Sequence, residues 1–191
     1  MNKWNKILEY LKNSKSEIKI LKTARETPVR EMEQYGIEPD SALESIVSHC
    51  GGLVFDNFIR LYGCGELDIF VRNAELNIDG AFVIGEDILG GLFAYLDERT
   101  IWYFAPDTLE WEDLEITYTQ FIRWLCIGEV STFYGDDRWQ GWENDIRNIA
   151  LHEGVLVFPF LWTPAKERTR KIVPMNEILR LEMEYNRQPV K

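Results

Sequence analysis

Apolar side chains recur along this chain with two periods, one typical of helices and one typical of strands. Residues 17–21 alternate between polar and apolar positions and predict a first strand. An amphipathic helix that ends near residues 13–14 is predicted before it, because apolar residues recur there at helical spacing: Trp4, Ile7, Leu8 and Leu11.

From Leu53 onward, short apolar and aromatic runs alternate with glycine-rich and acidic turns. Runs of this length that are rich in aromatic and β-branched residues indicate strands. Most of the connections are too short to hold a helix, so we expect an antiparallel meander. The predicted strands cover residues 53–60, 67–72, 80–84, 92–96 and 101–104, followed much later by a final, irregular strand over 155–162 that contains Pro159.

Capping residues mark the starts of further helices. Asp40 or Ser41 precedes a helix whose buried stripe is Leu43, Ile46 and Val47. The other predicted helices are residues 120–127, capped by Thr117 or Thr119 and closed by Gly128, one that opens out of a loop over 135–143, and a C-terminal helix over 176–186.

These elements predict an α+β fold with an antiparallel or mixed sheet of about five to six strands and helices packed on one side. The chain has 191 residues, 46% of them hydrophobic, which is enough for a packed core. We find no repeat or linker and expect a single domain over 1–191. Its parts are an N-terminal helix and strand (1–50), a central sheet (51–116) and a helical and C-terminal part (117–191).

The distribution of charge excludes one class of partner and favours another. The formal net charge is −11, and residues 66–145 contain 4 basic against 18 acidic side chains. Such a segment repels phosphate backbones, so nucleic acid is a poor ligand. A cationic protein would instead be attracted to it. The alternative is that the excess acid only keeps the protein soluble.

The chain has the features of a cytoplasmic protein. The N-terminus lacks an apolar stretch of signal-peptide length, and no run of about 18 apolar residues occurs, so we expect no membrane association. The three cysteines, Cys50, Cys64 and Cys126, are odd in number and form no CxxC pair. We interpret them as reduced thiols that pack in the core.

Residues for common catalytic chemistry are scarce. His49 and His152 are the only histidines, and with the cysteines they show no zinc-ligand spacing. Lysine is absent between Lys22 and Lys166, which excludes a phosphate-binding loop of the GxxxxGK[ST] kind there. We therefore expect no metal, no cofactor and no assigned catalytic residue. The glycine-rich stretch over 85–91 is interpreted as a turn between two strands.

Two groups of residues are candidates for contact with a partner. The first consists of acidic residues of the middle segment, where carboxylates could also carry out acid–base chemistry. The second is a loop in which two indoles lie among charges, since aromatic and arginine side chains contribute much of the binding energy at interfaces. The alternative is that these indoles pack the loop onto the body. The candidates are Glu86, Asp87, Asp107, Glu110, Asp136, Asp137, Arg138, Trp139 and Trp142.

Several strings resemble the DUF2625 family of uncharacterised bacterial proteins. They are residues 51–56 (GGLVFD), 85–94 (GEDILGGLFA), 102–111 (WYFAPDTLEW), 138–143 (RWQGWE) and 158–162 (FPFLW). This resemblance covers most of the chain and implies no activity. The order of strands and acidic turns is also similar, as a pattern, to the SUKH superfamily, whose mixed α+β fold is found in many bacterial immunity proteins.

The second resemblance, with the charge distribution, implies a non-catalytic protein-binding module of toxin-immunity type that covers a basic partner such as a nuclease toxin. It would present the acidic segment from Glu66 to Glu115 and the loop of Trp139 and Trp142. The alternative is a small-molecule-binding protein or hydrolase with an aromatic cleft lined by Glu86, Asp87, Asp107 and Glu110.

Overall fold

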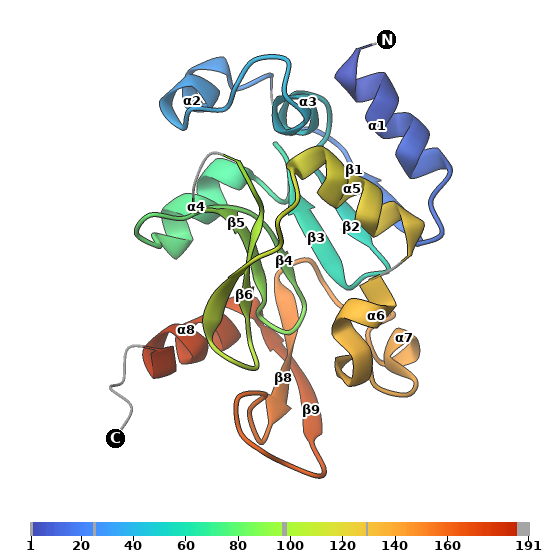
Figure 1. Cartoon of the computed structure of the whole chain (residues 1–191), viewed down its shortest axis with the longest axis vertical. Coiled ribbons are helices and arrows are strands. Elements are labelled where there is room, and N and C mark those ends of the chain that lie inside the picture. The colour runs from blue at the N-terminus through green and yellow to red at the C-terminus, as the bar shows by residue number, and fades with distance from the viewer. Residues whose placement is uncertain (1, 25, 97–98, 129, 187–191) are drawn as a thin grey trace.

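A meandering antiparallel sheet forms the centre of the computed structural model, which describes residues 2–24, 26–96, 99–128 and 130–186. Each of its seven strands pairs with the next one along the chain (Figure 1). The strands are β1 (Ile18–Leu21), β2 (Gly52–Phe55), β3 (Ile59–Tyr62), β4 (Phe82–Asp87), β5 (Leu92–Tyr95), β6 (Trp102–Ala105) and β7 (Glu110–Asp113).

A two-stranded antiparallel sheet, β8 (Glu153–Phe158) and β9 (Thr169–Pro174), lies beyond the turn between β4 and β5. The amide of Val155 donates to the carbonyl of Ile88 at 2.6 Å and so joins β8 to that turn. The C-terminal helix α8 (Met175–Asn186) packs against this small sheet.

Helices cover both faces of the large sheet. Glu86 of β4 is paired with Leu92 of β5, and residues paired in this way point to the same face of the sheet. Phe93, which follows Leu92 on β5, therefore points to the face opposite to that of Glu86. Phe93 contacts Phe121 of α5 (Tyr118–Ile127), whereas Glu86 is hydrogen-bonded to α4 (Ile69–Leu76). The remaining helices are α1 (Lys3–Lys12), α2 (Val29–Gln34), α3 (Ala42–His49), α6 (Val130–Tyr134), η1 (Gly135–Asp137) and α7 (Trp142–Asp145).

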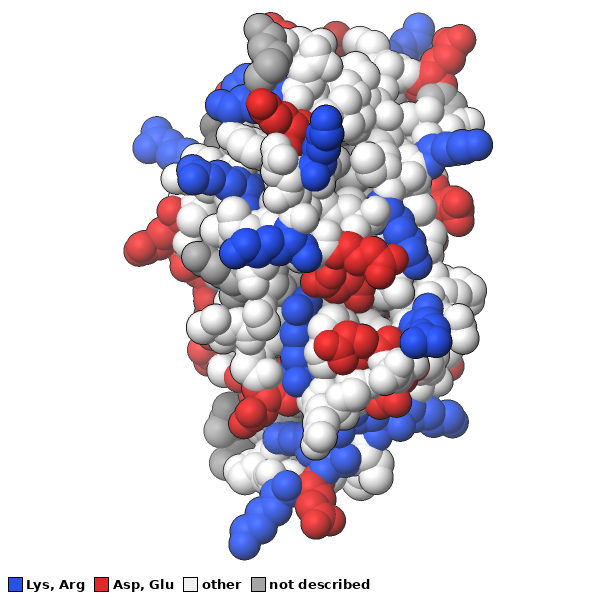
Figure 2. Space-filling view, turned by 90° about the vertical axis from the view of Figure 1, so that its right-hand side faces the viewer, with Lys and Arg blue, Asp and Glu red and all other residues white. Residues whose placement is uncertain are grey.

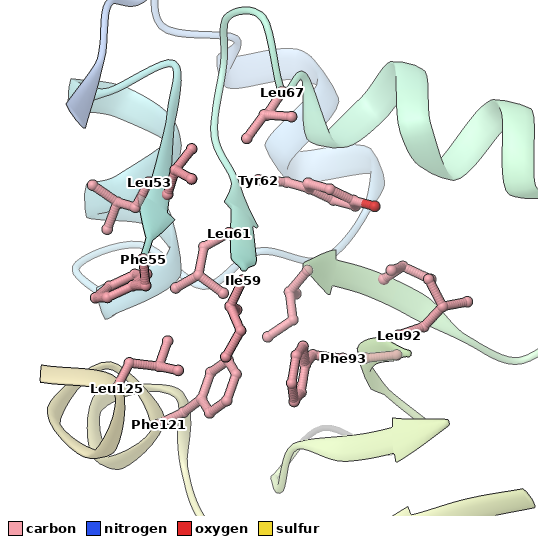
Figure 3. Packing of buried hydrophobic residues seen from close by; sticks show 14 of the residues in the cluster. Leu53, Phe55, Ile59, Leu61, Tyr62, Leu67, Leu92, Phe93, Phe121 and Leu125 are labelled. Carbon is pink, nitrogen blue, oxygen red and sulfur yellow. The ribbon is translucent and has the colours of Figure 1, made fainter. Parts of the chain in front are cut away.

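The main core lies between the sheet and the layer formed by α3 and α5. Figure 3 shows side chains of β2 and β3 meeting those of α5, and each of these residues is almost completely removed from water. Burial of this much aliphatic and aromatic surface is the main favourable term in folding. The residues seen there include Leu53, Phe55, Ile59, Leu61, Phe93, Phe121 and Leu125.

The structure confirms the α+β class, the antiparallel pairing and the helices that local signals marked. Helix α3 begins after the cap Ser41, and α5 begins after Thr117 and ends at Gly128. Three details of the prediction are wrong: the large sheet has seven strands instead of five to six, helices lie on both of its faces, and the strand at 155–162 is not the last. The structure contains β9 after it, and it also contains β7 and α6, which the sequence pattern did not reveal.

The predicted strand over residues 53–60 is a hairpin. Asp56 and Asn57 both have positive φ, 53° and 55°, and reverse the chain between β2 and β3. Two consecutive left-handed residues are the geometry of a tight hairpin turn, which Asn and Asp adopt more readily than most residues.

The predicted strand over residues 67–72 is wrong, because most of this segment belongs to the helix α4. The side chain of Asp68 caps it by accepting from the amides of Phe70 and Val71 at 3.0 and 3.2 Å. The apolar residues after the cap favour a strand by composition, and the cap, together with packing against β4, overrides that preference.

Replacing this cap tests its contribution. We expect Asp68→Ala to lower the free energy of unfolding by about 1 kcal/mol, because two amides of α4 lose their acceptor. Urea denaturation measures the difference. The control Asp79→Ala removes an exposed carboxylate that caps no helix and should change stability by less than ~0.5 kcal/mol. Equal effects of the two substitutions would contradict the capping role.

Candidate functional site

Glu86 lies inside the protein, with its side chain on the α4 face of β4. The residue is 1% exposed, and its carboxylate accepts from the Tyr62 hydroxyl and from the Arg72 guanidinium at 2.8 Å. Arg60, equally buried, approaches the other oxygen at 3.3 Å and donates to the Ala150 carbonyl at 3.0 Å. These contacts join β3, β4 and α4 to the chain before β8.

Asp87, the next residue, points to the opposite face and is fully buried. One carboxylate oxygen accepts from the hydroxyls of Tyr103 and Tyr134 at 2.7 and 2.8 Å. The other accepts from the amides of Leu89 and Gly91 at 2.8 and 3.0 Å. Burial raises the pKa of Asp87, and these four hydrogen bonds act in the opposite direction.

The glycines of the turn between β4 and β5 are required by the carboxylates around it. A Cβ on Gly91 would lie 2.2 Å from Asp87 Oδ2, and one on Gly90 would lie 2.3 Å from Glu182 Oε1. Glu182 belongs to α8, is 2% exposed, and has one oxygen without a hydrogen-bond partner. Burial and the Asp87 carboxylate raise the pKa of Glu182 well above its usual range. The predicted turn over 85–91 is confirmed for residues 88–91, while residues 85–87 belong to β4.

These positions correct the assignment of Glu86 and Asp87 to a partner-binding surface. Both are buried and satisfied by internal hydrogen bonds, so neither can touch a partner. The predicted cleft lined by Glu86, Asp87, Asp107 and Glu110 is also wrong. The first two point to opposite faces of β4, whereas Asp107 and Glu110 are exposed at the β6–β7 hairpin.

The loop of Trp139 and Trp142 is held to the body by arginines. The Arg138 guanidinium lies 4.5 Å from the ring centre of Trp142 and 4.7 Å from that of Phe58, and it approaches Asp56 at 3.6 Å. Arg170 of β9 covers Trp139 at 4.6 Å. Both indoles are half-buried, and we conclude that their main role is to pack the loop onto the body.

Acidic side chains near this loop are accompanied by basic ones. Asp136 is exposed, whereas Asp137 is partly buried. Burial and Asp107 raise the pKa of Asp137, while Arg168 and Arg170 act against them. Figure 2 shows the face turned to the right in Figure 1, where acidic and basic side chains lie next to one another. This face therefore carries no continuous negative surface.

An acidic group does remain on the surface, at the edge strand β7 and its flanks. All five of its members are exposed, and within the described part of the chain none of them forms an ion pair. Two of them, Asp107 and Glu110, are among the predicted partner-binding residues. We call this group the β7 acidic edge: Asp107, Glu110, Glu112, Asp113 and Glu115.

A cavity of about 740 Å³ lies above one end of the sheet. It lies where the starts of α3 and α5 approach one another (Figure 1). Its walls come from Lys3 of α1 and from four stretches of chain. These are the loop and helix start at 35–43, residues 80–82 at the entry to β4, the end of β5 at Tyr95 with Leu96 and Arg99 after it, and residues 117–119 at the start of α5.

Two helix N-termini open into this cavity. Ser41 caps α3 by accepting from the Glu44 amide at 3.0 Å, and Thr117 caps α5 through a capping box with Gln120. The first two amides of each helix have no carbonyl to bond inside the helix. The residues that carry these amides all line the cavity: Ala42, Leu43, Tyr118 and Thr119.

The rest of the lining mixes aromatic rings with charges of both signs. Tyr118 is 4% exposed, and its hydroxyl has no hydrogen-bond partner. Burial, followed by the charge of Glu38, raises the pKa of Tyr95 to about 12. The charged side chains of the lining are Lys3, Arg99, Glu38 and Asp40. This arrangement can bind a small polar ligand that also carries an apolar group.

The sequence-based candidates did not include this cavity. Its two helix starts were predicted with two possible caps each, of which Ser41 and Thr117 are the caps observed. Their convergence depends on how α3 and α5 pack on the sheet, which local patterns do not reveal.

The other predicted chemical groups are structural. Cys50, Cys64 and Cys126 are free and buried, and burial raises the pKa of Cys50 and of Cys126 to about 11. His49 is stacked on Trp4 at 5.1 Å. Nowhere in the described ranges do histidine, cysteine or acidic side chains gather as a metal ion would need. No helix within those ranges combines the length and apolar character that crossing a bilayer requires.

Comparison with known proteins gives a family for this fold. The family model described as "Protein of unknown function DUF2625" matches residues 2–178. The chain belongs to the DUF2625 family. It is 32% identical to the uncharacterised protein YbfG of Escherichia coli K12 over 196 residues, which cover 95% of this chain and 90% of that protein. An uncharacterised protein from Haemophilus influenzae Rd is 24% identical over 186 residues, which cover 88% of this chain and 79% of that protein. No solved structure matches the chain significantly.

The buried carboxyl of Glu182, with one oxygen that lacks a hydrogen-bond partner, predicts a pH-dependent stability. Because its pKa is raised from about 4.5, the folded chain keeps this proton to higher pH than the unfolded chain does. The free energy of unfolding should therefore fall as the pH rises above the pKa that the Glu182 carboxyl has in the unfolded chain. Glu182→Gln removes the titrating group, so the stability of this variant should not fall in this way. We expect the variant to be more stable than wild type by about 1–3 kcal/mol at pH 8 and by less at pH 5.

Urea denaturation across this pH range measures the effect. The control Glu184→Gln changes an exposed carboxyl two residues further along α8 and should follow the wild-type profile. If the wild type and Glu182→Gln gave parallel profiles, the buried carboxyl would not be the cause.

Proposed function

We propose that this protein is a non-catalytic binding protein whose site is the cavity between the starts of α3 and α5. The observation that carries the proposal is the cavity itself, with a volume of about 740 Å³. Ligand sites in proteins are typically hollows of this size in which aromatic walls are combined with a few polar groups. Tyr35, Phe82 and Tyr95 supply such walls here.

The lining favours binding over catalysis. Its two carboxylates, Glu38 and Asp40, are exposed to water, which is not the desolvated setting that adapts a carboxyl to acid–base chemistry at neutral pH. The buried carboxyls that do have raised pKa values, Asp87 and Glu182, are enclosed and do not line the cavity. We assign these two to the stability of the fold.

Filling the cavity tests the proposal. A panel of amino acids, nucleosides, sugars and organic acids would be screened by thermal shift, and we expect at least one member to raise Tm. Thr119→Trp should abolish this shift, because Thr119 lines the cavity and an indole there occupies the space. The matched control Thr132→Trp, at an exposed position on α6, should leave it unchanged. No stabilising member, or a shift that survives Thr119→Trp, would count against the proposal.

A second candidate function is the toxin-immunity role, in which the β7 acidic edge covers a basic partner such as a nuclease toxin. The specific observation that favours it is a group of five exposed carboxylates, three on β7 and two beside it, none of which forms an ion pair with another described residue. Carboxylates placed in this way attract a cationic protein and accelerate its association. The competing explanation is that charges on an edge strand prevent unwanted strand pairing.

Charge reversal separates these explanations. We expect a purified basic nuclease toxin domain from the same host to bind about tenfold more weakly when Glu110→Lys and Glu112→Lys are combined, and to bind less tightly as salt rises from about 50 to 300 mM. Isothermal titration and inhibition of the nuclease measure this. Glu66→Lys reverses an exposed charge outside the edge and serves as the control. If the affinity changes neither with salt nor with the charge reversals, the acidic residues would be explained by prevention of strand pairing at the edge of the sheet.

A further inference from the structure

Four aromatic side chains lie in a row on the surface, at the end of the molecule opposite to the cavity (Figure 1). We propose that a second copy of this chain binds to this row, so that two copies form a symmetric dimer. Phe158 is 60% and Tyr185 is 42% exposed, and the two rings between them are half-buried. We call these residues the aromatic row, which runs from the end of β8 to the end of α8: Phe158, Phe160, Trp162 and Tyr185.

The four rings contact one another and form one apolar surface. The ring centres of Phe158 and Phe160 lie 5.8 Å apart, and Phe160 stacks on Trp162 at 4.5 Å. Tyr185 lies 5.6 Å from Phe160 and 5.2 Å from Trp162. An aromatic side chain has about 150–250 Å² to bury, so Phe158 and Tyr185 alone leave roughly 200 Å² in water. With the two half-buried rings, this approaches the size of patch that marks an interaction site.

One arginine fixes the backbone that carries these rings. Arg168 Nη1 donates to the carbonyls of Pro159 and Phe160 at 2.7 and 2.6 Å. Its Nη2 donates to the carbonyls of Leu161 and Thr163 at 3.3 and 3.0 Å. A surface that is fixed before it binds loses less conformational entropy on association. The loop after β8 is therefore a preformed platform that presents its rings to a partner.

Acidic side chains lie at the α8 end of the aromatic row. The side-chain amide of Asn186, the residue after Tyr185, donates to the carbonyl of Leu109 at 2.7 Å. Leu109 lies in the β6–β7 hairpin between Asp107 and Glu110, two exposed members of the β7 acidic edge. Residues 107–115 contain five acidic and no basic side chains, a formal charge of −5. This end of the row is therefore negative.

Basic side chains lie at the β8 end of the aromatic row. Phe158 is paired with Thr169 of β9. Thr169 belongs to a segment, residues 166–171, that contains four basic side chains and one acidic, a formal charge of +3. Lys171 is exposed, and it points to the same face of the small sheet as Thr169 because it lies two residues further along the strand. Paired residues share a face, so Lys171 lies on the side that carries Phe158.

This polarity makes the surface complementary to itself. In a dimer with a two-fold axis, the same patch of both copies forms the interface. When the two aromatic rows lie antiparallel, rings meet rings, and the acidic end of each copy faces the basic end of the other. An anionic membrane surface would be repelled by the acidic end, and a partner with one sign of charge would be repelled by one end or the other. A second copy of the chain meets neither obstacle.

Sedimentation velocity of the full chain tests the proposal. We expect the mass of the sedimenting species to rise from one chain to two as the protein concentration is raised to about 100 μM. Phe158→Glu places a charge in the aromatic row and should raise the dissociation constant of the dimer at least about tenfold. The matched control is Val71→Glu on α4, at a side chain that is 54% exposed outside the row, and it should leave the constant unchanged.

An exchange of charge tests the antiparallel arrangement. Asp107→Lys and Lys171→Glu each bring like charges together twice in a symmetric dimer. Each should raise the dissociation constant about tenfold at about 50 mM salt. An equimolar mixture of the two variants should form a heterodimer with an affinity near that of the wild type, because both pairs of facing charges are then opposite in sign.

The outcomes decide between the possible occupants of the row. Loss of the dimer in Phe158→Glu and its recovery in the mixed charge variants would establish the proposed interface. A chain that stays monomeric at every concentration, or a dimer that Phe158→Glu leaves intact, would overturn it. A monomer that co-sediments with phosphatidylserine vesicles, and loses this binding in Phe158→Glu, would assign the row to a lipid surface instead. If the mixture of charge variants associates no better than either variant alone, the antiparallel arrangement is wrong.

Discussion

Two neighbouring carboxylates buried back to back on β4 constrain most of this structure. Glu86 holds α4 through Arg72 on one face of the sheet, and Asp87 holds α6 through Tyr134 on the other. A buried carboxylate that lost these partners would destabilise the fold by several kcal/mol. The positions of α4, α6 and the glycine turn that follows β4 are therefore linked to one dipeptide, and the chemistry of that dipeptide stabilises the fold without contacting a ligand.

Local signals in the sequence were sufficient for elements whose ends are set by their own residues. Ser41 and Thr117 begin helices by bonding to the adjacent backbone, and Gly128 ends one in a left-handed conformation. Gly128 was predicted outright, and Ser41 and Thr117 were each one of two predicted caps. Helix α4 was missed because its first residues favour strands, although Asp68 caps it. The hairpin between β2 and β3 was missed because apolar residues on both sides of Asp56 conceal the turn.

The site was harder to predict, because its parts are separated along the chain. Acidity in the middle of the sequence singled out Asp107 and Glu110, which are exposed, together with Glu86 and Asp87, whose burial depends on partners from distant elements. Tryptophans in a charged loop suggested an exposed anchor, and the arginines that cover them, Arg138 and Arg170, cannot be assigned to that role from spacing alone. The cavity itself follows from tertiary packing.

The walls of the cavity have a consequence for the behaviour of the molecule as a whole. They belong to the N-terminal helices, the start of β4, the end of β5 and the start of α5, stretches that would separate if the upper layer loosened. An occupant in contact with several of them acts as a non-covalent crosslink between the first and the middle thirds of the chain. Under the proposed binding function, occupancy would suppress partial opening and slow cleavage by proteases in the loop before α3, so that the lifetime of the protein would depend on the supply of the ligand.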